Sequence, residues 1–209
     1  MGSTYKLYGR QNAGSLAPQV VLEEIGAPYE LVWVGRSPAD VEDFRRINPA
    51  GKVPALVLPD GTPIAESAAI LIHLTSAHPE ASLAPPAGTT AHAQFLQWMV
   101  FLSAGLYETV LRCYYAERYS TSGPTAAEAI KNQALLDYDQ HLARMNAILS
   151  PYVLGERLSA ADPYLHMLAA WYPGDISALY SRLPRLARHA ALLRERPATQ
   201  KAESAHQET

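Results

Sequence analysis

Only one of the 209 residues is a cysteine, Cys113. A single cysteine excludes an intrachain disulfide and a Cys-x-x-Cys redox pair, and such low cysteine usage is typical of a reducing compartment. An excess of charge is absent as well, because 17 basic and 20 acidic side chains leave a formal net charge of −3. Without a basic field, we expect the protein to bind neither nucleic acid nor an anionic membrane surface.

Long apolar runs and targeting signals are also missing. The longest apolar runs fall well short of the ~20 residues that a membrane-spanning helix needs. The N-terminal residues lack the apolar core of a signal peptide, and Lys6 departs from the myristoylation pattern. The seven histidines show no metal-binding spacing such as His-Glu-x-x-His, so we expect no metal ion. These absences predict a cytoplasmic protein.

The segments that are present change in pattern near residue 80. Before it, strand-like and helical patterns alternate in the order β, α, β, α, β, β, α. The strand-like segments cover residues 5–8, 29–34, 53–58 and 63–65, and the helical segments cover residues 15–25, 37–46 and 66–77. Gly26 predicts the end of the first helix, and Asp60-Gly61 predicts a hairpin turn between the last two strands. The β-α-β start favours parallel pairing of the first two strands.

The rest of the chain is helical in period. Residues 79–88 are rich in proline and small side chains, which is typical of a linker. After them, helical patterns cover residues 91–119, 126–149, 160–171 and 183–196, and the polar residues from Ala198 onward are expected to fray. We therefore predict a first domain over residues 1–78, a linker over 79–88 and an all-helical domain over 89–209.

Three segments of the sequence carry a resemblance to one protein family. They are residues 6–8 with 15–26, residues 48–56 with 60–61 and 66–70, and residues 159–165. In this order and spacing they resemble the cytosolic glutathione transferases over nearly the whole chain, most closely the bacterial beta-type members. The resemblance implies an α/β domain of the thioredoxin type with a mixed four-stranded sheet, followed by an all-α helical bundle that forms the electrophile site. It also implies glutathione as co-substrate and a homodimer.

The middle segment is where the resemblance implies the glutathione site. It implies a cis bond between Val53 and Pro54, which turns the Val53 backbone toward the cysteinyl part of the ligand. Glu66 and Ser67 open a helix and suit the ammonium and carboxylate of the γ-glutamyl end. The alternatives are ordinary ones, since a Val-Pro pair can be a simple bend and a Glu-Ser pair a helix cap.

Two basic residues are candidates for the glycine carboxylate of the same ligand. Lys52 directly precedes the Val-Pro pair, and Arg36 is a looser candidate for the same role. The complete set of glutathione-binding candidates is Arg36, Lys52, Val53, Pro54, Glu66 and Ser67.

Chemistry on glutathione starts from its thiolate, because the neutral thiol is a poor nucleophile. Where the beta-type members have a tyrosine after the first strand and a cysteine in the following loop, this sequence has Gly9 and Gly14. Strand alternation points Tyr8 the other way, into the core. Two catalytic candidates remain, Ser15 at the helix start and Asn12 in the loop, and the alternatives for them are an N-cap and a turn residue. We expect Ser15 to contribute more, since it combines a hydroxyl donor with a helix dipole.

The helical domain offers three candidates for the electrophile site. Tyr107, Arg112 and Tyr115 belong to a long aromatic-rich helix, and ordinary helix packing is the alternative for each of them. Residues 159–162 fit a capping box that starts a buried helix. Cys113 is expected to be a small buried side chain rather than a nucleophile.

These patterns predict a glutathione transferase that joins the glutathione thiolate to a hydrophobic electrophile, or a related glutathione-dependent lyase or peroxidase. The alternative is a glutathione-binding scaffold or stress-regulator protein of the same fold without turnover. The replacement of two family donors by Gly9 and Gly14 keeps this alternative open.

Overall fold

The computed structural model describes residues 4–207, and the chain divides into two compact units. The first unit comprises Met1–Ala84 together with Arg194–Thr209, and the second comprises Pro85–Leu193. The division falls between Ala84 and Pro85, within the proline-rich segment 79–88. The C-terminal segment belongs to the first unit, although the sequence analysis assigned it to the helical domain.

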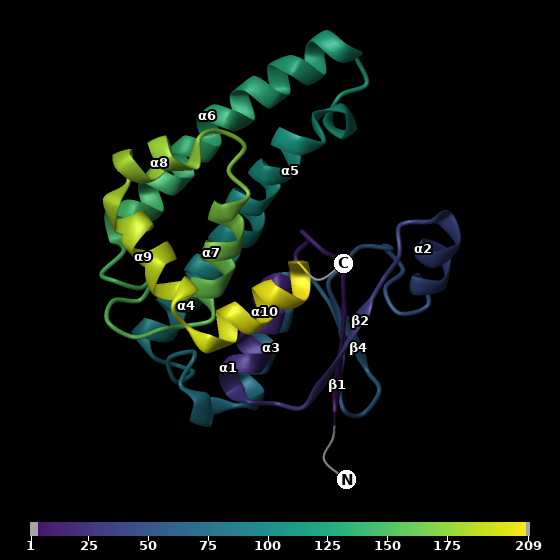
Figure 1. The fold of residues 1–209 in the computed structure, drawn as a ribbon, viewed down its shortest axis with the longest axis vertical. Helices are drawn as coiled ribbons and strands as arrows, with labels where there is room; N and C mark the ends of the chain where they lie inside the picture. The colour runs from purple at the N-terminus through teal and green to yellow at the C-terminus, as the bar shows by residue number, and fades with distance from the viewer. Residues whose placement is uncertain (1–3, 208–209) are drawn as a thin grey trace. The chain divides into compact units, whose positions relative to one another are not determined.

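The first unit is built on a four-stranded mixed sheet (Figure 1). The strands are β1 (Tyr5–Gly9), β2 (Tyr29–Trp33), β3 (Ala55–Val57) and β4 (Pro63–Ala65), in the order β2-β1-β3-β4. Strands β1 and β2 are parallel, with Gly9 opposite Trp33, whereas β3 is antiparallel to both of its neighbours. This arrangement confirms the predicted mixed sheet of a thioredoxin-like domain.

Helices cover both faces of this sheet (Figure 1). They are α1 (Leu16–Ile25), α2 (Pro38–Phe44), α3 (Ser67–Ala77) and α10 (Pro197–Gln207), with a short 3-10 turn η1 (Pro79–Ala81) after α3. Helix α2 lies on the side opposite α1, α3 and α10. The Tyr8 side chain points toward α2, and its ring centroid lies 5.6 Å from that of Phe44. Its neighbours in the strand, Leu7 and Gly9, are both buried. Gly26 ends α1 in the left-handed conformation, as the sequence predicts.

The prediction that the polar C-terminus frays is wrong. Helix α10 packs along α1, and its Thr199 and Ala202 are fully buried. Just before it, the Arg196 guanidinium donates two hydrogen bonds of 2.5 and 2.7 Å to the Glu24 carboxylate. Near its end, His206 meets the ring of Trp33 edge-on at 5.0 Å. The helix is ordered by these partners, which lie more than 150 residues earlier in the chain, so its own polar sequence does not reveal them.

Among the described residues, the second unit contains helices, turns and an isolated β-bridge between Tyr152 and Gly155, and no strand. Its elements are α4 (Thr90–Val100), a π-helical segment η2 (Phe101–Tyr107), α5 (Glu108–Tyr114), a 3-10 turn η3 (Ala116–Tyr119), α6 (Pro124–Ile148), α7 (Ala161–Ala170), α8 (Ile176–Arg182) and α9 (Pro184–Arg194). This helical region confirms the predicted all-α part of the fold. In the range 4–207, no helix is both long and apolar enough to cross a membrane.

The buried carboxylate of Asp162 organises the start of α7. It accepts hydrogen bonds from the Val153 N–H at 2.8 Å, from the Ser159 N–H at 2.7 Å and from the Ser159 hydroxyl at 2.9 Å. The His189 ring nitrogen Nε2 lies 3.0 Å from the same carboxylate, and both side chains are fully buried. Only half of the predicted capping box forms, because the Ser159 hydroxyl donates to Asp162 instead of accepting from its N–H.

We expect Asp162→Ala to lower the free energy of unfolding by about 3–5 kcal/mol, because it leaves several buried donors without an acceptor. The matched control is Asp175→Ala, which removes the exposed N-cap of α8 and should cost about 1 kcal/mol. Urea unfolding of the two variants measures both losses. Equal losses would show that the Asp162 carboxylate does not hold this part of the second unit together.

Candidate functional site

Most of the candidate residues in the first unit lie where β1 and β2 end. Because these strands are parallel, their carboxyl ends meet at one edge of the sheet, where ligands of α/β folds commonly bind. The loop after β1 leads into α1, and the carbonyl of Gly14 in that loop accepts a 3.4 Å hydrogen bond from the Ser67 hydroxyl. The N-terminal ends of α1 and α3 are therefore neighbours.

The segment before β3 presents an unpaired stretch of backbone. The Val53–Pro54 bond is cis, as the resemblance implies. The buried Asn48 braces this segment, since its amide accepts from the Ala50 N–H at 3.1 Å and donates to the Lys52 carbonyl at 2.6 Å. Within residues 4–207, no backbone hydrogen bond from Val53 is found. The Val53 main chain can therefore pair with an extended ligand, and the Lys52 side chain is exposed beside it.

The start of α3 has an unusual backbone. Glu66 is exposed and adopts φ 67° and ψ 115°, a region that non-glycine residues rarely occupy. Such conformations persist where the surrounding structure enforces them, often at binding sites. The next residue, Ser67, is 5% exposed and begins the helix, whose first-turn N–H groups can bind an anion.

The Ser15 side chain turns back into the loop that follows β1. Its side chain is fully buried, and its hydroxyl donates to the Arg10 carbonyl at 3.2 Å while accepting from the Arg10 N–H at 3.3 Å. It makes no side-chain cap of α1. The Ser15 hydroxyl proton, which a thiolate would need as its hydrogen-bond donor, is therefore donated to the Arg10 carbonyl. These two bonds join the first and last residues of the loop over residues 10–15.

Gly9 is sterically coupled to Ser15. A Cβ atom added at Gly9 would lie 2.5 Å from the Ser15 Oγ and 2.7 Å from the Ser15 Cβ, and 3.5 Å from the Trp33 ring. Atoms of real side chains do not approach so closely, so no side chain at position 9 fits while Ser15 keeps its place. The position at which the resemblance places a tyrosine is thus occupied by Ser15 from the loop and by Trp33 from β2.

The other catalytic candidate, Asn12, lies at the exposed tip of the same loop. Its φ of 52° is left-handed, a conformation that asparagine tolerates in turns. The Asn12 backbone therefore forms part of a turn.

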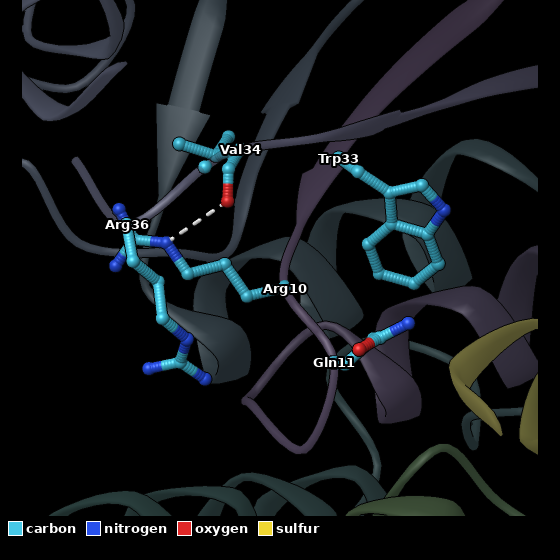
Figure 2. A pocket seen from close by; sticks show the side chains of 6 residues that line it. Arg10, Gln11, Trp33, Val34 and Arg36 are labelled. Carbon is cyan, nitrogen blue, oxygen red and sulfur yellow. Dashed lines mark hydrogen bonds between the residues drawn. The ribbon is translucent and has the colours of Figure 1, made fainter. Parts of the chain in front are cut away.

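A pocket that the sequence patterns do not predict lies at this edge of the sheet. The pocket has a volume of about 300 Å³, and it is lined by Arg10, Gln11, Trp33, Val34, Gly35 and Arg36 (Figure 2). The Arg10 Nε–H donates to the Val34 carbonyl at 3.2 Å, and its buried Nη2 has no hydrogen-bond partner among the described residues. Burial and the charge of Arg36 lower the pKa of the Arg10 guanidinium, which Asp40 partly offsets. Arg36, a candidate for the glycine carboxylate, lines this pocket and Lys52 does not.

One signal in the sequence could have located the pocket. Arg10 directly follows β1, and residues 34–36 directly follow β2. Residues at the carboxyl ends of two neighbouring parallel strands are brought together by the pairing itself.

The three candidates for the electrophile site have partners inside the second unit. The Tyr107 ring packs against the rings of Tyr164 and Trp171, at centroid distances of 6.3 and 5.6 Å. The Arg112 guanidinium pairs with Asp137 at 3.2 Å and donates to the Thr109 hydroxyl at 3.0 Å. The Arg118 guanidinium covers the Tyr115 ring at 3.9 Å from its centroid. These contacts favour structural roles for Arg112 and Tyr115.

Two further expectations concern reactive groups. Cys113 is buried, and burial raises the pKa of its thiol, which disfavours a nucleophilic thiolate there. No group of three His, Cys, Asp or Glu side chains within residues 4–207 is placed to hold a metal ion.

Known glutathione transferases are similar to this chain in sequence and in fold. A family model for the N-terminal domain of glutathione S-transferases matches residues 15–77. The uncharacterized GST-like protein YncG of Escherichia coli is 32% identical over 175 residues, which cover 81% of this chain and 82% of that protein. Glutathione S-transferase GstA of Escherichia coli is 27% identical over 96% of this chain and 98% of that protein. A glutathione transferase homologue from Sulfitobacter, solved with bound glutathione, has a TM-score of 0.86 at 26% identity, covering 97% of this chain and 98% of that one.

The contact between positions 9 and 15 can be tested by a double-mutant cycle. We expect Gly9→Ala to lower the free energy of unfolding by about 1–3 kcal/mol, because the added methyl group overpacks Ser15. In a Ser15→Gly background the same substitution should cost at least about 1 kcal/mol less.

The control for this cycle is Gly61→Ala in the hairpin turn, where φ is +90° and no atom beyond the adjoining residues lies within 4 Å of an added Cβ. Its cost comes from the backbone alone, so it should be the same in both backgrounds. A Gly9→Ala loss that is also independent of Ser15 would contradict the steric coupling.

Proposed function

Because this chain belongs to the glutathione S-transferase family, we propose that its first unit binds glutathione and activates the thiol for transfer to a second substrate. The observation that carries this proposal is the backbone of Val53, for which no hydrogen bond is found among residues 4–207 and which follows the segment braced by Asn48. An extended peptide ligand can add to this backbone in the manner of a further strand.

The polar ends of the tripeptide have matching groups in the same unit. The γ-glutamyl carboxylate meets the first-turn N–H groups of α3 at Ser67, and the ammonium meets the exposed Glu66 carboxylate. The glycine carboxylate pairs with Lys52, whose exposed side chain adjoins Val53. The left-handed backbone at Glu66 supports this assignment, since strain of this kind is typical of binding sites.

The thiol is activated by the main chain at the start of α1. Helix N-termini carry a partial positive charge and N–H groups without a partner in the helix, and both favour a thiolate over a neutral thiol. In the first turn of α1 the Ala17 N–H is the candidate donor, because Pro18 has no N–H and the Leu16 N–H donates to the Ala13 carbonyl at 3.4 Å. The thiol releases its proton to solvent, and the thiolate then attacks the electrophilic carbon of the second substrate. Ser15 is a positioning residue in this proposal, because its hydroxyl fixes the loop over residues 10–15 and does not face the sulfur.

A glutathione-binding protein without turnover is the second candidate function. It is favoured by one observation, the steric exclusion of any side chain at Gly9, which removes the position that the resemblance assigns to a tyrosine donor. In such a protein glutathione binds with its thiol protonated at neutral pH.

We expect Glu66→Gln to weaken glutathione binding about tenfold, because a charge-assisted hydrogen bond is worth about 1.5–3 kcal/mol. The matched control is Glu42→Gln, which changes an exposed carboxylate of α2 and should leave the affinity unchanged. Isothermal calorimetry measures both dissociation constants. Wild-type protein that binds no glutathione at millimolar concentration would contradict the proposed function. Equal affinities of the two variants would show that Glu66 does not contact the ligand.

We also propose that the protein is a homodimer, as the resemblance implies. Three large apolar side chains of the second unit support this, since Val100, Tyr114 and Leu136 are each more than half exposed. Light scattering at micromolar concentration should give twice the monomer mass of 22.8 kDa. A mass equal to that of the monomer would contradict the proposal.

A further inference from the structure

The pocket at the ends of β1 and β2 brings two arginine side chains together, and no carboxylate within residues 4–207 forms an ion pair with either of them. Figure 2 shows Arg10 and Arg36 on one side of it and Trp33 with Gln11 on the other. The Arg10 Nη2 is buried and unpaired among the described residues. No ion pair or hydrogen bond of the Arg36 side chain is found within residues 4–207, where it is exposed. Two adjacent guanidinium groups repel each other, so an anion between them would stabilise both.

The nearest carboxylate does not fill this role. Asp40 is close enough to influence Arg10, but its Oδ2 accepts hydrogen bonds from the Ser37 hydroxyl at 2.6 Å and from the Ser37 N–H at 3.2 Å. It is therefore held by the capping box of α2. Meanwhile the bond from the Arg10 Nε to the Val34 carbonyl fixes the guanidinium plane, and a fixed fork of this kind suits a carboxylate.

The opposite wall of the pocket is aromatic. The Trp33 side chain is 42% exposed although it is large and apolar, and His206 holds it edge-on from α10. An exposed indole face can stack on a planar ring. The volume of about 300 Å³ lies at the lower end of the range for small-molecule sites. The pocket therefore combines a cationic end with a flat apolar wall, in a space that suits a single aromatic ring.

The pocket also adjoins the start of α1. Arg10 forms one wall with its side chain, while its backbone N–H and carbonyl are bonded to Ser15, the residue that precedes α1. A ligand anchored on Arg10 is thus held by the same loop that leads to the first-turn amides of α1. A second substrate in this pocket would therefore lie beside the proposed thiolate.

We propose that this pocket binds the second substrate through an anionic group, so that the protein acts on aromatic electrophiles that carry a carboxylate. The inference rests on the proposed function and replaces the hydrophobic electrophile expected from the sequence. With an aryl chloride, the glutathione sulfur forms a bond to the ring carbon and chloride leaves, while the thiol proton has gone to solvent. Arg10 and Arg36 hold the carboxylate, and Trp33 holds the ring.

The same chemistry could come from glutathione itself, whose glycine also carries a carboxylate. The two sources differ in what a change at Arg36 should affect. If the pocket holds the second substrate, loss of the Arg36 charge weakens the binding of that substrate alone. If it holds the glycine carboxylate, the same loss weakens the binding of glutathione.

The test uses two aryl chlorides of nearly the same size, the anion chloronitrobenzoate and its neutral amide, chloronitrobenzamide. Wild-type protein is compared with Arg36→Gln and with Arg46→Gln, a matched control on an exposed arginine whose side chain lies 3.5 Å from Asp43. Steady-state rates give the KM for each electrophile and for glutathione. Calorimetry without glutathione gives the affinity for chloronitrobenzoate independently of turnover. An Arg10→Lys variant, which keeps the charge but loses the guanidinium fork, is measured in the same way.

We expect Arg36→Gln to raise the KM and the dissociation constant for chloronitrobenzoate about tenfold, and Arg10→Lys to raise them by a smaller factor. The values for the amide and for glutathione should change less than twofold, and Arg46→Gln should change none of them. A matching loss of glutathione affinity in Arg36→Gln would assign the pocket to the glycine carboxylate and overturn the proposal. Equal wild-type binding of chloronitrobenzoate and chloronitrobenzamide would overturn it too. If chloronitrobenzoate binds in a way that depends on Arg36 but is not turned over, the anion site would be confirmed and the proposed transferase activity would be contradicted.

Discussion

The hydroxyl of Ser15 hydrogen-bonds to both the N–H and the carbonyl of Arg10, and the candidate site of the first unit depends on this interaction. It closes the loop over residues 10–15 and keeps Ser15 fully buried. It also leaves no space for a side chain at Gly9, because an added Cβ would lie 2.5 Å from the Ser15 Oγ. One buried hydroxyl thereby removes a side-chain donor from the end of β1 and fixes the backbone from which the Arg10 side chain reaches the pocket.

The consequence is a site whose proposed chemistry depends mainly on the main chain. The Val53 backbone and main-chain N–H groups at the starts of α1 and α3 supply hydrogen bonds, although Pro18 in the first turn of α1 has no N–H and the Leu16 N–H donates to the Ala13 carbonyl. Charged side chains stand around these groups, with Glu66 before α3 and Lys52 before Val53. The two arginines of the pocket form a separate cationic region after β1 and β2. We propose that main-chain groups bind glutathione, while the two arginines select second substrates that carry a carboxylate.

The sequence predicted the parts of this fold that depend on local patterns. The order of strands and helices, the hairpin at Asp60-Gly61 and the end of α1 at Gly26 follow from alternation and from turn chemistry, and the structure agrees with them. Helix α10 could not be predicted in this way, because Thr199 and Ala202 are buried only by packing against the rest of the first unit. Whether the Ser15 hydroxyl caps the helix or turns back to Arg10 depends on the loop conformation. The pocket, finally, depends on the pairing of β1 with β2, which brings together residues more than 20 positions apart.

The central claim is that backbone amides at the start of α1, and not the Ser15 hydroxyl, stabilise the glutathione thiolate. The most direct measurement is the absorbance of the bound thiolate against pH in wild type, Ser15→Ala and Asn12→Ala. A positive helix end favours the charged form, so the pKa of the bound thiol should fall below the free value of about 8.5 in all three proteins. The two variants should lie within about half a pKa unit of wild type, since neither removes a main-chain N–H. A rise of about one unit or more in Ser15→Ala alone would show that its hydroxyl reaches the sulfur, and would contradict the account.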